Sequence, residues 1–382
     1  MRAEARIEER ILTALSMNGR APARLVGKIV GISSQKAYRR IRNLEDKYKI
    51  RYLAETDLEG LGYLKFVILI KFLREIPRSD DLGRILETEA RIQYAAVLRG
   101  GDYDLMLYVM AESNREIGLV SARLRRNTLL LKYPAEWYTT PFYEHYGFMP
   151  LRDEFIDTLK DKIIDRASAR SYQATKEKKK QMMQREFAIL RELNGNGSAD
   201  LMDVDRKYGF DTGRAQYAYY KLIESGILKR VTISLQNLPV RYMAAIFIKV
   251  TDMELYYGTR DSLLMDIVGR SDTPVNKYAL AGDIATPFGV LMLMPVFGER
   301  DLDDTIRMLS EAKGMTIKSA IITTTLVGGL CFRRFDSAYS KQVEVMHSEF
   351  GMRLPGKTVY QEKQQTHGRS SGSAVIDFGD LD

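Results

Sequence analysis

The side chains best suited to chemistry in this chain are amides and cations that follow one another at helical spacing between positions 33 and 48. The stretch reads SSQKAYRRIRNLEDKY. At about 100° per residue, Ala37, Ile41 and Leu44 share one stripe, and Arg39 and Arg42 lie opposite. Amide and guanidinium groups match the edges of adenine and guanine, and cations match phosphates. The stretch therefore predicts a helix whose polar face suits double-stranded DNA.

Position along this helix divides the candidates, because the first turns of a reading helix reach base edges while later turns meet phosphates. The candidates for base contacts are Gln35, Lys36 and Arg39, with Ser34 at the helix start as a further DNA contact. The candidates for phosphate contacts are Arg40, Arg42, Asn43 and Lys47. A solvated surface helix is the alternative for each charge, most plainly for Arg40 and Lys47.

The chain repeats itself at a constant offset of 178 positions, without a gap. The recurring residues include Ile11, Gly31 and Lys71, which return as Ile189, Gly209 and Lys249. Most of the recurring positions are ones that helix packing and turns would keep. We therefore interpret the chain as two copies of one module.

The second copy of the candidate DNA-reading helix, residues 211–225, carries fewer cations than the first. Its candidate DNA contacts are Arg214, Gln216, Tyr217, Tyr220 and Lys221. Packing against the neighbouring copy is the alternative for the two tyrosines. Any DNA footprint should therefore be asymmetric.

Each copy begins with three helices and a short β-rich piece with a basic edge, the pattern of a winged helix-turn-helix. The expected helices are 4–17, 22–30 and 33–48, then 182–194, 199–208 and 211–225. The β pieces are 50–54 and 227–233, with Lys49, Arg51, Lys229 and Arg230 at their edges. This context favours DNA binding over a merely solvated helix.

Strands and helices then alternate as βαββαβ, the order of a ferredoxin-like antiparallel sheet. In the first copy the expected elements are 64–72, 80–89, 92–98, 105–110, 114–126 and 135–140. In the second copy they are 243–250, 260–269, 275–280, 290–296, 301–313 and 316–325. One face of each sheet needs cover, so we expect the two sheets to pair.

The expected fold class is α+β, with two winged helix-turn-helix domains alternating with two ferredoxin-like domains and the sheets paired as a pseudo-dimer. The expected domains are 1–58, 59–150, 184–238 and 239–354, with a linker at 151–183 and a disordered tail at 355–382. The linker should be helical through Phe155, Leu159 and Ile163. Its KEKKK run (176–180) either contacts phosphates or is solvated.

Two stretches carry a resemblance to the Lrp/AsnC family of transcription regulators. They are SSQKAYRRIRNLEDKYKIRYLAETDLEGLGY (33–63) and VLRGGDYDLMLYV (97–109). The resemblance implies pairing through the sheet domains, hence a homo-oligomer in addition to the pseudo-dimer. It also implies pseudo-palindromic DNA targets and an amino-acid effector near the sheet interface.

The GDYD turn holds the candidate effector contacts, Gly101, Asp102 and Asp104. The two carboxylates could meet the ammonium of an amino acid, and turn N–H groups its carboxylate. We favour the alternative that GDYD is a tight turn in which Gly101 supplies unusual backbone angles. In the second copy, LAGDIATPFGVLML (280–293), Gly282 and Asp283 match the motif, but nothing matches Asp104.

The composition of the chain indicates what kind of partner and which cellular compartment to expect. A formal net charge of +8 and a pI near 9.2 favour a polyanionic partner. A single cysteine, Cys331, an N-terminus unlike a signal peptide, and apolar runs too short for a membrane span favour a cytoplasmic, nucleoid-associated protein.

Enzyme motifs are missing from the sequence. The three histidines are scattered, and no CxxC, HExxH, GxGxxG or Walker loop occurs. We therefore expect no catalytic residues, no metal site and no cofactor. Two alternatives to a regulator stay open: an architectural DNA-binding protein without an effector, and an enzyme like the sirohaem decarboxylases, which pair two modules of this fold.

Overall fold

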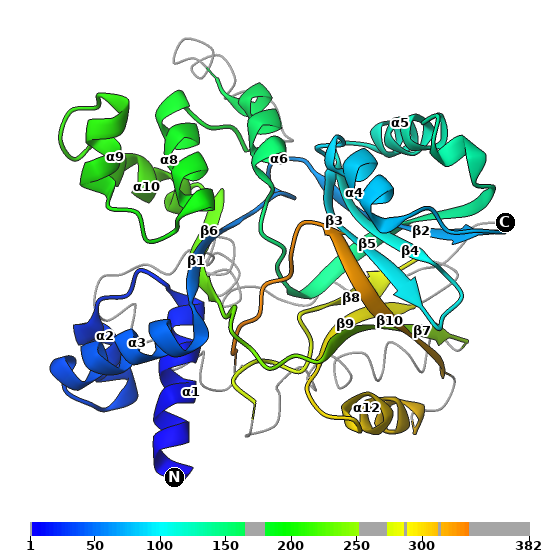
Figure 1. Cartoon of the computed structure of the whole chain (residues 1–382). Coiled ribbons are helices and arrows are strands. Elements are labelled where there is room, and N and C mark those ends of the chain that lie inside the picture. The colour runs from blue at the N-terminus through cyan, green and yellow to red at the C-terminus, as the bar shows by residue number, and fades with distance from the viewer. Residues whose placement is uncertain (1, 165–179, 252–272, 286–288, 312–314, 336–382) are drawn as a thin grey trace, which may run out of the picture.

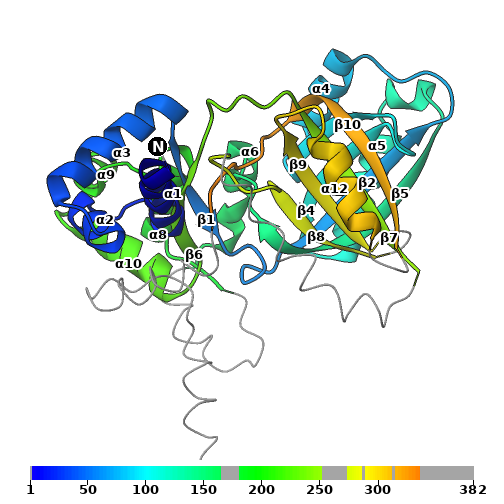
Figure 2. The ribbon, with the colours of Figure 1, turned by 90° about the horizontal axis from the view of Figure 1, so that it is seen from below.

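The computed structural model describes residues 2–164, 180–251, 273–285, 289–311 and 315–335. A helical unit and a β-barrel lie side by side (Figures 1 and 2). Below, residues up to 164 are called the first half and residues from 180 the second half. Each half contributes to both the helical unit and the barrel.

The helical unit contains two sets of three helices and one strand. The first set is α1 (Arg2–Met17), α2 (Ala23–Val30), α3 (Ser34–Tyr48) and β1 (Arg51–Thr56). The second set is α8 (Gln184–Gly195), α9 (Leu201–Tyr208), α10 (Arg214–Glu224) and β6 (Leu228–Ser234). The helices expected from the sequence are present, with ends shifted by a few residues.

Local sequence explains the turn between α2 and α3. Gly31 adopts φ 80°, a left-handed conformation that glycine takes without strain, and it ends α2. The Ser33 side chain accepts a hydrogen bond from the Lys36 N–H, which caps α3. Ala37 and Leu44 are buried on the inner face of α3, as the helical pattern predicts.

The strands after the two helical sets correct the prediction of two separate wings. β1 and β6 pair antiparallel with each other and form one two-stranded sheet between the halves. The pairs Leu53–Thr232 and Ala54–Val231 exchange under a shift of 178 positions, so this ladder has an internal two-fold relation. A single strand leaves its backbone groups unpaired, and the strand of the other half satisfies them.

The barrel joins two four-stranded groups with the same internal strand order. The first group is β2 (Leu64–Phe72), β3 (Ile92–Arg99), β4 (Leu105–Ala111) and β5 (Ala135–Gly147). The second is β7 (Tyr242–Val250), β8 (Leu280–Ile284), β9 (Val290–Val296) and β10 (Met315–Val327). The order around the closed barrel is β10-β3-β4-β2-β5-β8-β9-β7. The fourth strand of each group therefore pairs with the second strand of the other.

Helices cover the outside of the barrel (Figure 2). Its inside is filled by apolar side chains, among them Leu69, Met106 and Leu293. α4 (Ser79–Glu87) and α5 (Asn114–Arg125) pack on the first group, and Leu86, Val120 and Ile68 belong to one buried apolar cluster. α12 (Asp301–Ser310) packs on the second group. The 3-10 helix η1 (Leu130–Lys132) precedes β5. The α+β class is thus observed, with the sheets joined edge to edge rather than stacked.

Several other expectations need correction. The strand expected at 275–280 is β8, at 280–284, so Gly282 and Asp283 lie in a strand and not in a turn. β5 and β10 each run to 13 residues because their far halves pair with the opposite group. The helix expected at 260–269 and the tail at 355–382 lie outside the described residues.

The described part of the linker is only partly helical. It forms α6 (Asp153–Thr158) and the 3-10 helix η2 (Leu159–Lys162). Phe155 and Leu159 are buried as predicted, whereas Ile163 lies beyond the helices and forms an isolated bridge with Met182. Most of the KEKKK run lies outside the described residues. Its last residue, Lys180, makes an internal ion pair.

Candidate nucleic-acid interface

The exposed face of α3 presents the candidate base contacts together. Ser34, Gln35, Lys36 and Arg39 are all exposed at the start of the helix. The side chains of Gln35, Lys36 and Arg39 make no hydrogen bond or ion pair with any described residue. Their donors and charges are therefore available to an external partner.

The candidate phosphate contacts divide into two groups. Arg40 and Lys47 face α1 and form ion pairs of 3.1 Å with Glu4 and Glu8. Arg42 is exposed, pairs with Glu45 at 3.3 Å, and lies 5.6 Å from the Tyr38 ring centroid. The Tyr38 and Glu45 contacts hold the pKa of Arg42 above its ordinary value. Asn43 is exposed and has no side-chain partner among the described residues.

The candidate DNA contacts on α10 are exposed, but more of them contact other side chains of the protein. Arg214 lies 3.6 Å from Asp211, and Lys221 pairs with Glu224 at 2.7 Å. Gln216 donates to the Tyr220 hydroxyl at 3.4 Å. Tyr217 and Tyr220 are 59% and 57% exposed, so neither is buried against the other half.

The basic edge expected on the wings is only partly at the surface. Lys49 and Arg51 are exposed. Lys229 lies 3.8 Å from Asp57, and Arg230 turns inward and donates to Glu55 at 2.7 Å. Arg230 is therefore a structural residue of the β1–β6 sheet.

A buried charge cluster around Glu55 was not predicted from the sequence. Arg230 and Arg333 each donate to Glu55 at 2.7 Å, and Arg333 also approaches the Gly147 carbonyl at 3.4 Å. Burial alone would raise the pKa of Glu55, but the two guanidinium groups hold it well below its ordinary value. This cluster, the Glu55 cluster, joins both strands of the central sheet to the barrel.

The GDYD segment is occupied by internal contacts. The Asp104 carboxylate accepts from the Phe72 N–H at 2.9 Å and lies 3.4 Å from Lys71. Asp102 forms an ion pair with Lys318 on β10. These contacts favour the turn interpretation over an effector contact.

The glycines of this segment differ from expectation by one position. Gly100 has the left-handed angle, φ 82°, so the assignment of that role to Gly101 was wrong. A Cβ on Gly101 would lie 2.9 Å from the Ala320 Cβ, so close packing on β10 is what favours glycine there.

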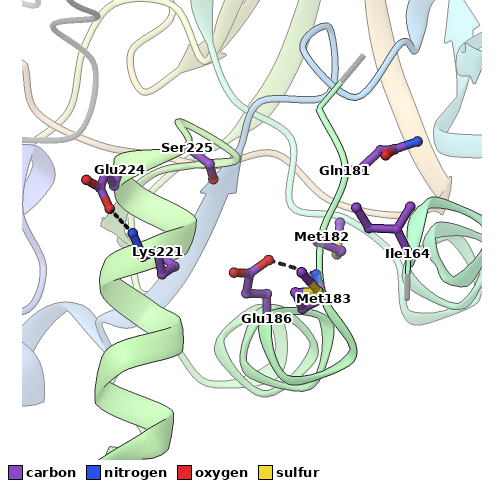
Figure 3. Close-up of a pocket in the computed structure, with 8 residues that line it drawn as sticks. All are labelled: Ile164, Gln181, Met182, Met183, Glu186, Lys221, Glu224 and Ser225. Atoms are coloured by element: carbon purple, nitrogen blue, oxygen red, sulfur yellow. Dashed lines mark hydrogen bonds and ion pairs between the residues drawn. The ribbon is translucent and has the colours of Figure 1, made fainter. Parts of the chain in front are cut away.

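Two pockets flank the helical unit. One, of about 350 Å³, lies between the linker and α10 (Figure 3). Within it Glu186 accepts from the Met183 N–H, and Lys221 pairs with Glu224, so its charged groups already have partners. The other, of about 370 Å³, lies beside α3 and includes Tyr38, Glu45 and Ser198 in its lining.

Neither a metal cluster nor a membrane span is found in the part of the chain that the structure describes. No group of three or more potential metal ligands occurs among those residues. None of their helices is both long and apolar enough to span a bilayer.

The curated proteins that match this sequence are HTH-type transcriptional regulators. No family model matches the chain. The HTH-type transcriptional regulator FL11 of Pyrococcus abyssi is 24% identical over 112 residues, 29% of this chain and 73% of FL11. FL11 of Pyrococcus horikoshii matches equally well.

Among solved structures, the siroheme decarboxylase NirDL aligns with 90% of this chain and 99% of its own, at 11% identity and a TM-score of 0.55. The AsnC family transcriptional regulator of Agrobacterium tumefaciens aligns with 35% of this chain and 88% of its own, at 17% identity and a TM-score of 0.31. The expected resemblance to transcription regulators is confirmed by the FL11 relatives, which are HTH-type transcriptional regulators. The NirDL alignment shows that a solved structure shares the fold over most of the chain.

Proposed function

We propose that this protein is a DNA-binding transcription regulator of the Lrp/AsnC type that reads double-stranded DNA with α3. α10 makes a weaker second set of contacts. The regulator relatives support this proposal, because they match the chain over 112 residues. The protein would act at the nucleoid.

One observation carries the proposal most directly. Gln35, Lys36 and Arg39 are exposed on the first turns of α3 and have no side-chain partner among the described residues. On a helix that only faced solvent, charged side chains could form ion pairs within the protein. Arg40 and Lys47 do so with α1. The polar groups left unpaired are those at the end of the helix that enters the major groove in helix-turn-helix proteins.

The internal symmetry supports a tandem duplication that acts as a pseudo-dimer. The β1–β6 ladder and the two barrel junctions each relate one half to the other. A two-fold arrangement of reader helices suits a pseudo-palindromic site. Since the two reader helices differ, we propose a site with one strong and one weak half.

By analogy with Lrp/AsnC regulators, we also propose that an amino-acid effector binds at the barrel. Asp102 and Asp104 are held by Lys318 and by Phe72 and Lys71. An effector at GDYD would have to displace those partners. Titration of amino acids against the DNA complex, with Asp102→Asn as the variant, tests this part separately.

The test is fluorescence anisotropy with randomised and selected duplexes over a salt series. The double variant Lys36→Ala/Arg39→Ala should lose most of its preference for the selected duplex. Arg307→Ala on α12 is the matched control, because Arg307 is an exposed arginine on the barrel. Wild type should show a steep salt slope, and each lost phosphate contact should reduce that slope by about one unit. A low ratio of specific to non-specific affinity would favour the architectural alternative.

A second candidate function is a sirohaem decarboxylase-like enzyme. The observation that favours it is the NirDL fold alignment over 90% of the chain. Titration of the protein with sirohaem, followed by the visible absorption spectrum, separates the two. A regulator that leaves the spectrum of the tetrapyrrole unchanged would exclude the enzyme.

A further inference from the structure

The two Asn-Gly turns of the helical unit have the same local structure but different following residues. The Arg20 N–H donates to the Asn18 Oδ1 at 3.0 Å. The Ser198 N–H donates to the Asn196 Oδ1 at 3.1 Å. The repeat offset of 178 thus places Arg20 of the first half opposite Ser198 of the second.

Arg20 reaches across to the second half and binds two backbone carbonyl groups there. We call this binding site, made by Gly197, Ala199 and Tyr219, a seat. Its Nη1 donates to the oxygens of Gly197 at 2.8 Å and Ala199 at 2.9 Å. Its guanidinium carbon lies 5.4 Å from the centroid of the Tyr219 ring, within the range of a cation–π contact. This seat is therefore a guanidinium-binding site filled by the protein itself.

The equivalent seat in the first half is open. The counterparts of Gly197, Ala199 and Tyr219 are Gly19, Ala21 and Ile41, and all three line the pocket of about 370 Å³ beside α3. Ser198, the counterpart of Arg20, also lines it, and so does Arg20, whose guanidinium group is bound to the carbonyl groups of the second half. The Ser198 hydroxyl is too short to fill the seat and donates to the Asn196 Oδ1 at 2.7 Å.

The open seat has a carboxylate that the filled seat lacks. Glu45 lines the pocket, whereas its counterpart in the second half is Ile223. Glu45 accepts a hydrogen bond from the Tyr52 hydroxyl at 2.6 Å and pairs with Arg42 at 3.3 Å. Tyr38 and Tyr52 supply aromatic walls, which offset the replacement of Tyr219 by Ile41.

We propose that this pocket binds a small guanidinium compound, of the class of free arginine or agmatine. The carbonyl groups of Gly19 and Ala21 would accept from the guanidinium, as those of Gly197 and Ala199 do from Arg20. No described side chain donates to either of these two carbonyl groups. The pocket volume is at the small end of the roughly 300–1,000 Å³ found for ligand sites, which suits a metabolite.

A ligand in the pocket would change the contacts of side chains on α3. Tyr38, Arg42 and Glu45 all lie on that helix, and a bound guanidinium competes with Arg42 for the Glu45 carboxylate. Release of Arg42 would change its availability to phosphate. This consequence rests on the proposed DNA function, but ligand binding itself does not.

The test is isothermal titration of the full chain with agmatine, with butylamine as an ammonium control. Wild type should bind one equivalent of agmatine and prefer it to butylamine. Ser198→Arg places in the open seat the side chain that fills the other one, and should weaken agmatine binding by tenfold or more. Met202→Arg is the matched control, because it adds the same charge at an exposed position of α9 outside the pocket.

The reverse variant, Arg20→Ser, should open the second seat and raise the stoichiometry from one to two. Because Arg20 also lines the first pocket, this variant is read by its stoichiometry, and the affinity of the first pocket is compared only between wild type and Ser198→Arg. A folded Arg20→Ser protein that still binds one equivalent contradicts the equivalence of the seats. Wild type that does not bind agmatine at millimolar concentration, or Ser198→Arg that binds as tightly as wild type, overturns the proposal. Should Arg20→Ser not fold, the Ser198→Arg comparison decides alone. None of these readouts involves DNA, so failure here is distinct from failure of the proposed regulator.

Discussion

The two reader helices, α3 and α10, occupy equivalent places in the two halves, but their N-terminal caps and their exposed side chains differ. α3 is capped by its own Ser33 and presents Gln35, Lys36 and Arg39 without partners among the described residues. The N-cap of α10 is a glycine, Gly213, which has no side chain to cap the helix, and a buried carboxylate from α9 takes that role. The Asp205 side chain accepts from the N–H groups of Gly213 at 2.7 Å and Ala215 at 2.6 Å.

The second half thus uses polar groups for internal structure where the first half leaves them available. The counterpart of Asp205 is Gly27, which cannot supply a carboxylate. The counterpart of the filled guanidinium seat is an open pocket. We therefore expect the first half to carry recognition and the second half to carry more of the stability of the helical unit.

The largest expected effect follows from the Glu55 cluster, which holds both halves together. Arg333→Ala leaves the buried Glu55 carboxylate with one guanidinium partner, and Arg333 itself is only 6% exposed. We expect a loss of about 3–5 kcal/mol in the free energy of unfolding, as for other broken buried ion pairs. Urea denaturation measures it, with Arg241→Ala, at an exposed ion pair with Glu299, as control. Equal midpoints for the two variants would contradict a joining role for the cluster.

The next effect compares the two helix starts. Asp205→Ala removes the buried carboxylate that accepts two hydrogen bonds from backbone N–H groups at the start of α10, and we expect a cost of about 2–3 kcal/mol in the free energy of unfolding. Ser33→Ala removes one exposed cap from α3, and we expect about 1 kcal/mol. Thermal unfolding of both variants checks the order. A larger loss for Ser33→Ala would mean that α3, not α10, depends more on its cap.

A smaller effect separates the cations within α3. Arg42→Ala should reduce the salt slope of DNA binding by up to about one unit, because Arg42 is exposed. Arg40→Ala and Lys47→Ala should reduce it less, because these side chains are paired with α1. The stability cost of the latter two should stay within about 1 kcal/mol, as for other surface ion pairs. Anisotropy over a salt series ranks all three.

Sequence patterns predicted the elements whose signals are local. α3 follows from the Ser33 cap, the apolar stripe and Gly31, all within one stretch of chain. β2 was predicted with its observed bounds, since its apolar run stands between polar residues. The constant repeat offset predicted that the halves would correspond.

What could not be predicted depends on contacts between distant residues. Glu55 lies 175 positions from Arg230 and 278 from Arg333, so no local pattern marks their cluster. The pairing of β1 with β6 and the closure of the barrel are non-local for the same reason. The open seat did have a signal: Arg20 and Ser198 differ at equivalent positions of an otherwise similar turn.

The decisive comparison is between Arg39→Ala and Arg214→Ala, measured on the same selected duplex by fluorescence anisotropy. Arg39 has no partner among the described residues, whereas Arg214 lies near Asp211. We predict a loss of about 1–3 kcal/mol in binding free energy and relaxed base preference for Arg39→Ala, with a smaller change for Arg214→Ala. Equal losses, or a larger loss for Arg214→Ala, would contradict the claim that α3 is the principal DNA-reading helix.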